Sequence, residues 1–420
     1  MVFAAAVVVG GLLYLESKQS ELTVGPGAGG PPEPEQPESK PSTFVWPTFG
    51  YDRARTSHVP SELKPPFKRI WRTKPTGELL EFPPSLARGR LFVAENNGRV
   101  IALSARTGRR LWKRDLGALA ASTPTYDKGR LYVTILCLKA CTTAIGSTES
   151  NGRGRVAALS ARTGKVLWKR DLPGRAESTP VVVRDRLYFG SEDGTVYALR
   201  TRNGRTDWTY QAADDVKASL AYKDGRLYFG DYSGSVNALR ARDGKLVWSR
   251  SNVSPENFYS APAVGFGRIF LSSTDGKVHA LRMNGDVDWR FSAGPQGYIY
   301  AAPALAEPLG LGPTVFIGSH DRRFYALDAR SGRVRWSKRA FGEISGTAAV
   351  IGKYVYFSAF RGSRTTYGLR TRDGKEAFRR PQRAFDPAIA DDKRLYLIGY
   401  ASITALEPRR KPRQGGSAKR

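Results

Sequence analysis

Few side chains of this chain have the types and spacings that chemistry requires. Cys137 and Cys141 are the only cysteines, and the three histidines, His58, His279 and His320, stand far apart. Two cysteines supply half of a structural zinc site, and no histidine lies at ligand spacing. We therefore expect no metal site. Outside the cytoplasm, a disulfide between Cys137 and Cys141 is expected, with two free thiols as the alternative.

The sequence also lacks the short motifs that accompany catalysis. It contains no G-x-S-x-G, no phosphate-binding P-loop, no H-E-x-x-H and no aspartate-rich calcium loop. These absences favour a binding protein over an enzyme and leave catalysis to be tested.

The net charge is the strongest signal in the composition. The chain has 67 Lys and Arg residues against 38 Asp and Glu residues, a formal net charge of +29 and a pI near 10.3. Such a charge predicts a polyanionic neighbour, or else reflects an arginine-rich proteome. We do not expect nucleic acid, because the aromatic residues lie within apolar runs rather than beside arginines on an open platform.

A repeat must position these side chains. Segments such as ALSARTGKVLW, ending at Trp168, and ALRARDGKLVW, ending at Trp248, recur at intervals of 40 to 56 residues. Within one repeat, short runs rich in Val, Tyr and Leu alternate with Gly and Asp turns, which predicts four antiparallel strands. Four strands in about forty residues is the size of one propeller blade. The longest repeat contains an insertion at residues 135–152, which holds both cysteines.

Eight such units are present, and the last one lacks its fourth strand. An isolated run at residues 67–73 precedes the first unit and contains Trp71 in the position of the recurrent Trp. We therefore predict an all-β fold over residues 44–408, an eight-bladed β-propeller of four-stranded antiparallel blades. The N-terminal 67–73 strand would close the last blade, which limits exposed sheet edges.

The unit A-L-x-x-x-x-G-x-x-x-W resembles the repeat of the pyrroloquinoline-quinone-type, or quinoprotein-like, β-propeller family. The likeness covers residues 44–407, and WPTFG at residues 46–50 resembles the usual lead-in of that family. The family includes quinoprotein alcohol dehydrogenases and the propeller lipoprotein of the bacterial outer-membrane assembly machine, and the chain resembles the lipoprotein more. One departure is that the Asp common after Ala-Leu in the family is kept only at Asp328.

The resemblance implies that the recurrent Gly and Trp dock neighbouring blades together, and we expect these residues to be structural. They are Trp71, Gly108, Trp112, Gly164, Trp168, Gly204, Trp208, Gly244, Trp248, Gly285, Trp289, Gly332, Trp336, Gly374 and Phe378. All of the Trp residues are expected in the blade core.

The resemblance also implies an alternative function, a quinoprotein oxidoreductase that binds pyrroloquinoline quinone with Ca²⁺. The enzymes of the family carry adjacent cysteines and a calcium-holding set of acidic and amide residues. Here the two cysteines are four positions apart, and those ligands cannot be matched residue by residue. We therefore expect no cofactor.

Strand direction predicts how charge is distributed over the disc. The first-to-second and third-to-fourth turns share one face and are rich in Arg and Lys, whereas the other face carries more Asp and Glu. We expect the basic face to meet a polyanion through Arg200, Arg202, Arg240, Arg242, Arg370 and Arg372. The other face, with Phe258, Tyr259, Tyr298 and Tyr300 in fourth-to-first connections, is expected to point towards a partner.

The ends of the chain differ from the repeats in composition. Residues 1–15 are apolar and are interpreted as a signal anchor or a truncated signal sequence, with a cleaved signal peptide as the lesser alternative. Residues 16–43, rich in Pro, Gly and Glu, predict a disordered tether, and residues 409–420 a basic disordered tail. The sequence thus favours a monomeric, membrane-tethered propeller on the extracellular or periplasmic side. We expect it to be a non-catalytic scaffold for a protein or an anionic envelope polymer.

Overall fold

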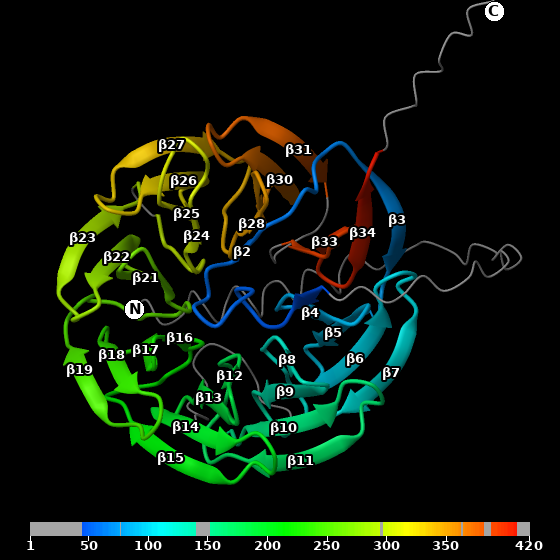
Figure 1. Ribbon diagram of the computed structural model, residues 1–420, viewed down its shortest axis with the longest axis vertical. Helices are drawn as coiled ribbons and strands as arrows, with labels where there is room; N and C mark the ends of the chain where they lie inside the picture. Colours follow the sequence, from blue (N-terminus) through cyan, green and yellow to red (C-terminus); the bar gives the residue numbers. More distant parts are fainter. Residues whose placement is uncertain are drawn as a thin grey trace, which may run out of the picture.

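The computed structural model describes residues 44–75, 77–139, 152–294, 297–362, 364–381 and 388–409. The regular structure of these residues is β-strand throughout, in eight sheets arranged around a common axis (Figure 1). The predicted eight-bladed propeller of four-stranded antiparallel blades is confirmed. In these ranges no helix is long and apolar enough to cross a membrane. The predicted anchor, tether and basic tail, apart from Arg409, lie outside the described residues, as does most of the insertion.

Each blade contributes one short strand to the wall around the axis and a longer second strand beside it. The innermost strands are β4 (Ser85–Ala87), β8 (Thr125–Asp127), β12 (Val181–Val183), β16 (Ala221–Lys223), β20 (Ala263–Gly265), β24 (Ala304–Ala306), β28 (Ala349–Ile351) and β32 (Ile389–Ala390). The second strands are β5 (Arg90–Ala94), β9 (Arg130–Ile135), β13 (Arg186–Gly190), β17 (Arg226–Gly230), β21 (Arg268–Ser272), β25 (Thr314–Gly318), β29 (Tyr354–Ser358) and β33 (Leu395–Ile398).

The third and fourth strands complete each blade towards the rim. The third strands are β6 (Arg99–Ser104), β10 (Arg155–Ser160), β14 (Thr195–Arg200), β18 (Val236–Arg240), β22 (Lys277–Arg282), β26 (Arg323–Asp328), β30 (Thr365–Arg370) and β34 (Ile403–Pro408). The outermost strands are β7 (Arg110–Asp115), β11 (Val166–Asp171), β15 (Thr206–Gln211), β19 (Leu246–Arg250), β23 (Val287–Ser292), β27 (Val334–Arg339), β31 (Glu376–Pro381) and β3 (Phe67–Thr73).

The sequence pattern of each strand matches its place in the blade. Second and third strands are covered on both sides by neighbouring blades, so they are almost continuously apolar and buried, as in β13. Outermost strands alternate half-buried and exposed residues, as in β11, because one side faces solvent. The apolar core therefore lies between blades, where, for example, Phe92 of β5 packs in one cluster with Leu131 of β9.

The ring is closed by an N-terminal strand, as predicted. Strand β3 pairs antiparallel with β34, the third strand of the last blade, in the sheet β3-β34-β33-β32. Trp71 lies opposite Ala405 across this pair. The same register recurs in the other blades, for example Trp112 opposite Ala102, with a bulge directly after the Ala. The closing strand thus reproduces the local geometry of an uninterrupted repeat.

Hydrogen bonds between turns define the two faces of the disc. The third-to-fourth turn bonds the first-to-second turn of its own blade, as in Ala105 N to Gly89 O at 2.8 Å. The residue after the fourth strand bonds the second-to-third turn, as in Leu116 N to Gly98 O at 3.0 Å. We call the first end of the disc the turn face. The second end, which also carries the fourth-to-first connections, is called the connection face.

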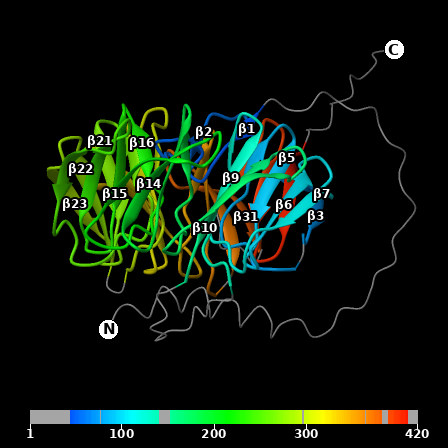
Figure 2. The same ribbon diagram turned by 90° about the horizontal axis from the view of Figure 1, so that it is seen from below.

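Residues 44–59 form a feature that the repeats did not predict, and we call this segment the axial plug. It includes two short strands: β1 (Val45–Trp46) pairs antiparallel with β4 of the first blade, and β2 (His58–Val59) pairs parallel with β28 of the seventh. Its carbonyl groups accept bonds from further innermost strands, as in Tyr222 N to Arg53 O at 2.7 Å. The plug therefore crosses the ring at its centre (Figure 1), and the side view places β1 and β2 at one end of the disc (Figure 2).

The plug lies at the turn face. Gly352, in the first-to-second turn of the seventh blade, donates its N–H to Val59 O at 3.0 Å. A Cβ at Gly352 would lie 2.1 Å from Ser61 O, so the chain that leaves the plug runs directly against this turn. Residues 44–66 thus stay on the turn face until β3 begins. The end of β34 lies on the same face, since Arg409 N bonds Pro66 O at 2.8 Å.

Arg55 holds the plug to the ring from the axis. Its side chain is 1 % exposed. Its guanidinium donates to Leu220 O at 3.0 Å in the fourth blade and to Thr179 O at 2.9 Å in the third. It also donates to Thr48 Oγ1 and Phe49 O within the plug. Burial lowers the pKa of Arg55 to about 9, so the group remains a cation at neutral pH.

Candidate functional site

The recurrent Gly and Trp lie at the boundaries between blades. Each Gly of a third-to-fourth turn has a positive φ and packs against the Trp ring of the preceding blade, where a Cβ would lie 2.6–2.8 Å from a ring atom. Only glycine combines this backbone conformation with so close an approach. The contacting pairs are Gly108 with Trp71, Gly164 with Trp112, Gly204 with Trp168, Gly244 with Trp208, Gly285 with Trp248, Gly332 with Trp289 and Gly374 with Trp336.

A hydrogen bond accompanies each of these contacts. The indole N–H donates to a backbone carbonyl of the same turn in the next blade at 3.0–3.2 Å. The rings are therefore mostly half-buried at the blade boundary rather than inside a blade core, although Trp248 is only 8 % exposed. Phe378 takes the corresponding position in the seventh blade and packs edge-on against Phe67 at 5.6 Å.

The six arginines expected to face a polyanion divide into two groups. Those at the ends of third strands are held by aspartates: Arg200 by Asp185 at 2.6 Å, Arg240 by Asp243 and Arg370 by Asp373. Those two positions later are exposed, namely Arg202, Arg242 and Arg372. The Arg242 side chain is 73 % exposed, with Asp243 at 3.5 Å. Aspartates in turns of the same face thus neutralise part of the positive charge that the sequence predicted for it.

The connection face carries a different set of side chains around the axis, which we call the axial mouth. It consists of two repeat-equivalent positions. The first is the residue four positions before each innermost strand, and the second is the residue two positions after each second strand. Among the described residues the first position holds Glu81, Ala121, Glu177, Lys217, Tyr259, Tyr300 and Ser345, and the second holds Asn96, Cys137, Glu192, Tyr232, Thr274, His320, Phe360 and Tyr400.

One half of the axial mouth is a row of charged groups. Lys217 Nζ lies 3.0 Å from Glu177 Oε2 and 3.7 Å from Glu192 Oε1. Arg175 Nε lies 3.2 Å from the other oxygen of Glu192. The Tyr259 hydroxyl donates to Glu177 Oε1 at 3.1 Å. The side chains of Glu177, Glu192 and Lys217 are 7 %, 13 % and 14 % exposed, so this network is largely removed from water.

Burial shifts the pKa values of this row. Desolvation, with the charge of Glu177 beside it, raises the pKa of Glu81 to about 7. Desolvation also raises the pKa of Glu177, and it raises that of Asp215 to about 6. Burial alone would lower the pKa of Lys217, but Glu177 and its other neighbours raise it well above its usual value. Near neutral pH Lys217 is therefore charged, while Glu81 lies close to its titration midpoint.

The other half of the axial mouth is aromatic. The ring of Tyr259 lies beneath Lys217 Nζ at 5.3 Å and packs edge-on against Tyr300 at 5.8 Å. The row continues from Tyr300 to His320 at 4.9 Å and from His320 to Phe360 at 5.5 Å. Tyr259 thus joins the charged half to the aromatic half, and contacts run around the axis from the third blade to the seventh.

His320 occupies the middle of the aromatic row as a neutral side chain. Its Nε2 lies 2.5 Å from Ser345 Oγ, and its Nδ1 lies 3.7 Å from Glu343 Oε2. Burial, with Arg361 nearby, lowers the pKa of His320 to about 4. The imidazole therefore acts as an aromatic and hydrogen-bonding group near pH 7.

The structure corrects one expected partner-facing residue. Tyr298 is 39 % exposed, and Tyr259 and Tyr300 are partly exposed on the connection face. Phe258, by contrast, is fully buried. It packs on Gly230 of β17, where a Cβ would lie 2.4 Å from the Phe258 side chain. Phe258 is therefore part of the core and cannot contact a partner.

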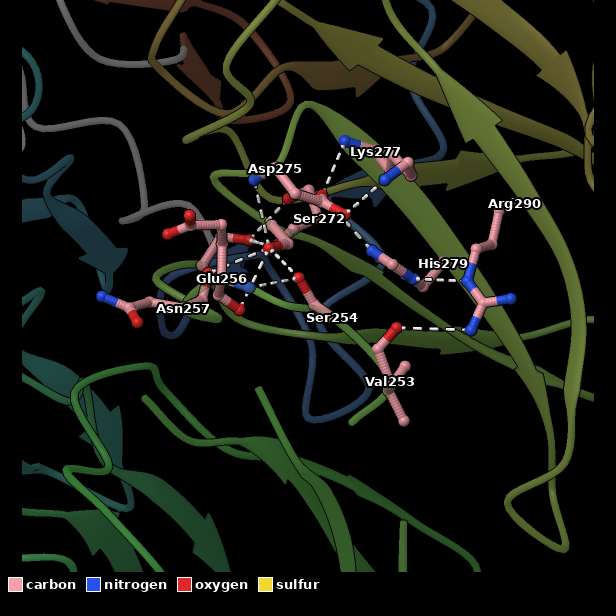
Figure 3. Close-up of polar contacts among 11 residues, drawn as sticks. Val253, Ser254, Glu256, Asn257, Ser272, Asp275, Lys277, His279 and Arg290 are labelled. Carbon is pink, nitrogen blue, oxygen red and sulfur yellow. Dashed lines mark hydrogen bonds and ion pairs between the residues drawn. The ribbon is translucent and has the colours of Figure 1, made fainter. Parts of the chain in front are cut away.

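A second concentration of titratable groups lies in the fifth blade (Figure 3). His279 is buried between Asp275, 3.4 Å from its Nε2, and Arg290, whose Nε donates to His279 Nδ1 at 3.3 Å. Burial alone would raise the pKa of Asp275, but bonds from His279 and Lys277 lower it to about 2. This network joins a second-to-third turn to its own third strand.

Equivalent turns in other blades contain comparable networks. Tyr325 donates to Asp321 in the sixth blade, and Asn237 donates to Asp231 at 3.0 Å in the fourth. We therefore interpret the Asp275–His279 contact as a hairpin lock of the repeat and not as a site. In the part of the chain that the structure describes, no three His, Cys, Asp or Glu side chains are grouped to hold a metal ion.

The insertion is only partly described. Cys137 is buried and disulfide-bonded, and its backbone forms an isolated antiparallel β-bridge with Leu119. Cys141 lies outside the described residues, so its pairing with Cys137 stays a prediction.

Sequence reasoning placed Tyr259, Tyr298, Tyr300 and Glu192 on this face but missed Glu81, Glu177 and Lys217 of the charged half. Glu81, Glu177 and Lys217 each look like an ordinary polar residue within one repeat. Their signal was available, because all three stand four positions before an innermost strand. Superimposing the repeats on that position would have placed them together around the axis.

Comparison with known proteins agrees with this architecture. The family described as outer membrane protein assembly factor BamB matches residues 63–135, 142–257 and 213–412. BamB of Escherichia coli is 28 % identical over 169 residues, which are 37 % of this chain and 38 % of that protein. Polyvinylalcohol dehydrogenase of a Sphingopyxis strain is 38 % identical over 89 residues, 20 % of this chain and 14 % of that enzyme. The matched parts thus span less than half of either relative.

Solved structures share the fold at low sequence identity. BamB from Moraxella catarrhalis superimposes with a TM-score of 0.65 at 16 % identity, covering 81 % of this chain and 100 % of that one. Quinohemoprotein alcohol dehydrogenase from Comamonas testosteroni gives a TM-score of 0.66 at 14 % identity, covering 88 % and 82 %. The family match covers most of the propeller, and the chain belongs to the pyrroloquinoline-quinone-type β-propeller family described as outer membrane protein assembly factor BamB.

Proposed function

We propose that this chain is a non-catalytic binding scaffold outside the cytoplasm and that it holds a protein partner at the axial mouth of the connection face. The main support for this proposal is that the propeller fold does not require charged residues at the mouth. At the position of Glu81, Glu177 and Lys217, the second and seventh blades have Ala121 and Ser345. Burying a charged side chain costs folding free energy. Glu81, Glu177 and Lys217 are charged where equivalent positions are not, which supports a role in binding.

Two further features support a partner at this face. Exposed aromatic rings beside charged groups are typical of protein interfaces, and Tyr298 and Phe341 are 39 % and 65 % exposed in fourth-to-first connections. BamB, with which the chain shares its family, bears the name of an assembly factor of the outer membrane. We also propose that residues 1–15 tether the protein to a membrane.

The test is position-specific photocrosslinking in intact cells. A photoreactive amino acid at Tyr298, on the connection face, should capture a discrete partner, and excess purified protein should compete for it. The same amino acid at Leu309, which is 93 % exposed in a first-to-second turn, serves as the matched control on the turn face. Equal capture at both positions would contradict a partner at the connection face.

Contact between the turn face and an anionic surface is a second part of the proposal. It is supported by the exposed side chains of Arg202, Arg242 and Arg372, and by the plug and the end of β34, which lie on the same face. Reversing these three residues to Glu should abolish binding to anionic vesicles at low salt. Reversing the Asp-paired Arg200, Arg240 and Arg370 should have a smaller effect. If the first triple variant binds as well as the parent, the turn face is only a solvated surface.

The quinoprotein alternative is favoured by the match to polyvinylalcohol dehydrogenases. The described residues do not fit a calcium-held quinone. Lys217 and Arg175 already pair with Glu177 and Glu192 in the charged row of the mouth, and no three described His, Cys, Asp or Glu side chains are grouped to hold a metal ion. Reconstitution with pyrroloquinoline quinone and Ca²⁺ decides between the two functions. Bound-cofactor absorbance or dye-linked alcohol oxidation would overturn the non-catalytic proposal.

A further inference from the structure

The axial mouth has a local charge opposite to that of the molecule. The chain as a whole carries a formal charge of +29. The charged half of the mouth and its neighbours Asp215 and Arg175 together hold four carboxyl groups and two cations, which are Glu81, Glu177, Glu192 and Asp215 with Lys217 and Arg175. A cationic ligand is therefore repelled by the net charge of the molecule and attracted by this half of the mouth.

Two of these carboxyl groups have unused acceptor capacity. The Glu81 side chain forms no hydrogen bond or ion pair with any residue that the structure describes, although it is only partly exposed. Glu192 Oε1 is buried without a hydrogen-bond partner, and Lys217 Nζ is 3.7 Å away. Buried acceptors are normally satisfied, because an unpaired one loses the hydrogen bonds that water would give it. A cation beside either group would supply a missing donor.

The other groups of the mouth suit the rest of such a ligand. Tyr259 already holds one ammonium group, that of Lys217, over its ring. Tyr300 and Phe360 extend the aromatic surface from that point around the axis. Lys and Arg side chains combine a charged end with an apolar stem, and both parts are favourable against aromatic rings.

The axis is closed below the mouth. Arg55 is buried there and bonds Thr179 O, two residues beyond Glu177 in the same connection. Its guanidinium makes its bonds to carbonyl and hydroxyl oxygens, so the mouth carboxylates are not its hydrogen-bond partners. A ligand that approaches from the connection face therefore meets the mouth before Arg55.

We propose that the axial mouth is a receptor for a lysine or arginine side chain of a partner protein, with Glu81 and Glu192 accepting from the cation and Tyr259 and Tyr300 covering its stem. This inference rests on the proposed function in one respect, that the partner approaches from the connection face. It adds the chemistry of the group that is recognised.

The test measures peptide binding to the full chain by fluorescence anisotropy. The probe is a labelled, terminally blocked peptide, Gly-Ser-Lys-Phe-Ser-Gly, and its control has norleucine in place of lysine. A neutral isostere is needed because an acidic control would bind the arginines elsewhere. We expect saturable binding of the lysine peptide and at least tenfold weaker binding of the norleucine peptide.

Substitutions locate the site. Glu81→Gln should weaken the lysine peptide at least fivefold, and Glu192→Gln should act in the same direction. Glu81 has no hydrogen bond or ion pair with a described residue, so its substitution leaves no group unpaired, and a melting temperature equal to or above that of the parent would verify folding. Glu307→Gln, the same change in an exposed residue of a first-to-second turn, should leave binding unchanged.

The outcomes separate this inference from the proposed function. Equal binding of both peptides, or equal binding by Glu81→Gln and the parent, would overturn the cation receptor. Partner capture at Tyr298 could still succeed in that case, and the scaffold function would stand on the aromatic half alone. Specific lysine binding without partner capture would instead overturn the protein scaffold and leave a site for a small cation.

Discussion

Gly244 lies against the indole of Trp208 across a blade boundary, so closely that a Cβ on the glycine would lie 2.6 Å from Cε3 of the ring. The indole N–H of Trp208 donates to Ala241 O, three residues before the glycine, at 3.1 Å. The same relation recurs around the ring up to the closing strand, where Gly108 lies against Trp71. Neighbouring blades are thus joined by a repeated contact that depends on the absence of a side chain.

Gly244→Ala should therefore destabilise the protein by more than the cost of placing alanine at a positive φ. Gly225→Ala is the matched control, because Gly225 has a φ of +80 and nothing within 4 Å of its Cβ position. The control should lose about 1–2 kcal/mol for the left-handed backbone. Gly244→Ala should lose about 1–3 kcal/mol more, since it overpacks the Trp208 contact. Urea denaturation measures both, and equal losses would mean that the contact adds nothing.

Trp248→Ala should lower the free energy of unfolding by roughly 3–5 kcal/mol as a large-to-small substitution of a buried ring. Trp248 is 8 % exposed and donates to Met283 O at 3.1 Å. Leu246→Ala, in the same strand but 49 % exposed, should have a much smaller effect. Thermal and urea denaturation compare the two. A loss below about 1 kcal/mol for Trp248→Ala would contradict its docking role.

Arg55→Met should destabilise the protein strongly because it removes four bonds at the axis. The carbonyl groups of Thr179 and Leu220 would lose their donor while remaining buried, at about 1–3 kcal/mol each. Arg53→Met is the control, since Arg53 is exposed and donates one side-chain bond, to Val182 O. Melting temperatures that fall equally in both variants would show that the axial bonds carry no special weight.

Truncation separates the plug from ring closure. Removal of residues 1–43 should leave the melting temperature nearly unchanged, because the described propeller begins after them. Removal of residues 1–59 takes away the plug and should lower it. Removal of residues 1–74 also takes away β3, exposes the edge of β34 and should cause aggregation, detected by size-exclusion chromatography. If the first and last truncations melt alike, the eighth blade closes in another way.

Glu81 should make stability depend on pH. Its pKa in the folded protein is about 7, above the ordinary value of 4.5, so the folded state binds the proton more tightly. Stability should therefore fall as pH rises from about 4.5 to 7, by up to about 3 kcal/mol. Glu81→Gln should be more stable than the parent at pH 8 and equal to it at pH 4.

Urea denaturation at both pH values measures this difference, with Glu307→Gln as the control that should show none. The lysine peptide should bind the parent more tightly as pH rises from 5.5 to 8, because Glu81 must ionise to accept a cation. A variant that gains stability and loses binding would identify Glu81 as a residue that costs stability for the sake of binding.

The sequence by itself determined the architecture, because the residues that specify the strands and turns lie close together and recur in every repeat. The first six units each carry their own turn Gly and Trp, and the seventh has Gly374 and Phe378. The 67–73 run had no partner of its own, and the last unit was the one that lacked a fourth strand. Trp71 accordingly lies opposite Ala405 in the same register that the other blades show, for example Trp112 opposite Ala102. Eight independent copies of one pattern make the strand order robust to error in any single copy.

The tertiary structure alone decided which side chains meet at the axis. Arg55 bonds Thr179 and Leu220 across 124 and 165 residues, and no pattern within residues 44–59 foretells those partners. Phe258 and Tyr259 are adjacent in sequence, yet one fills the space above Gly230 and the other faces the mouth. Arg200 and Arg202 look alike in sequence, and only the position of Asp185 and Asp207 distinguishes them. Ring closure brings these distant connections together, so the charge and shape of the axial mouth belong to the ring and not to any single repeat.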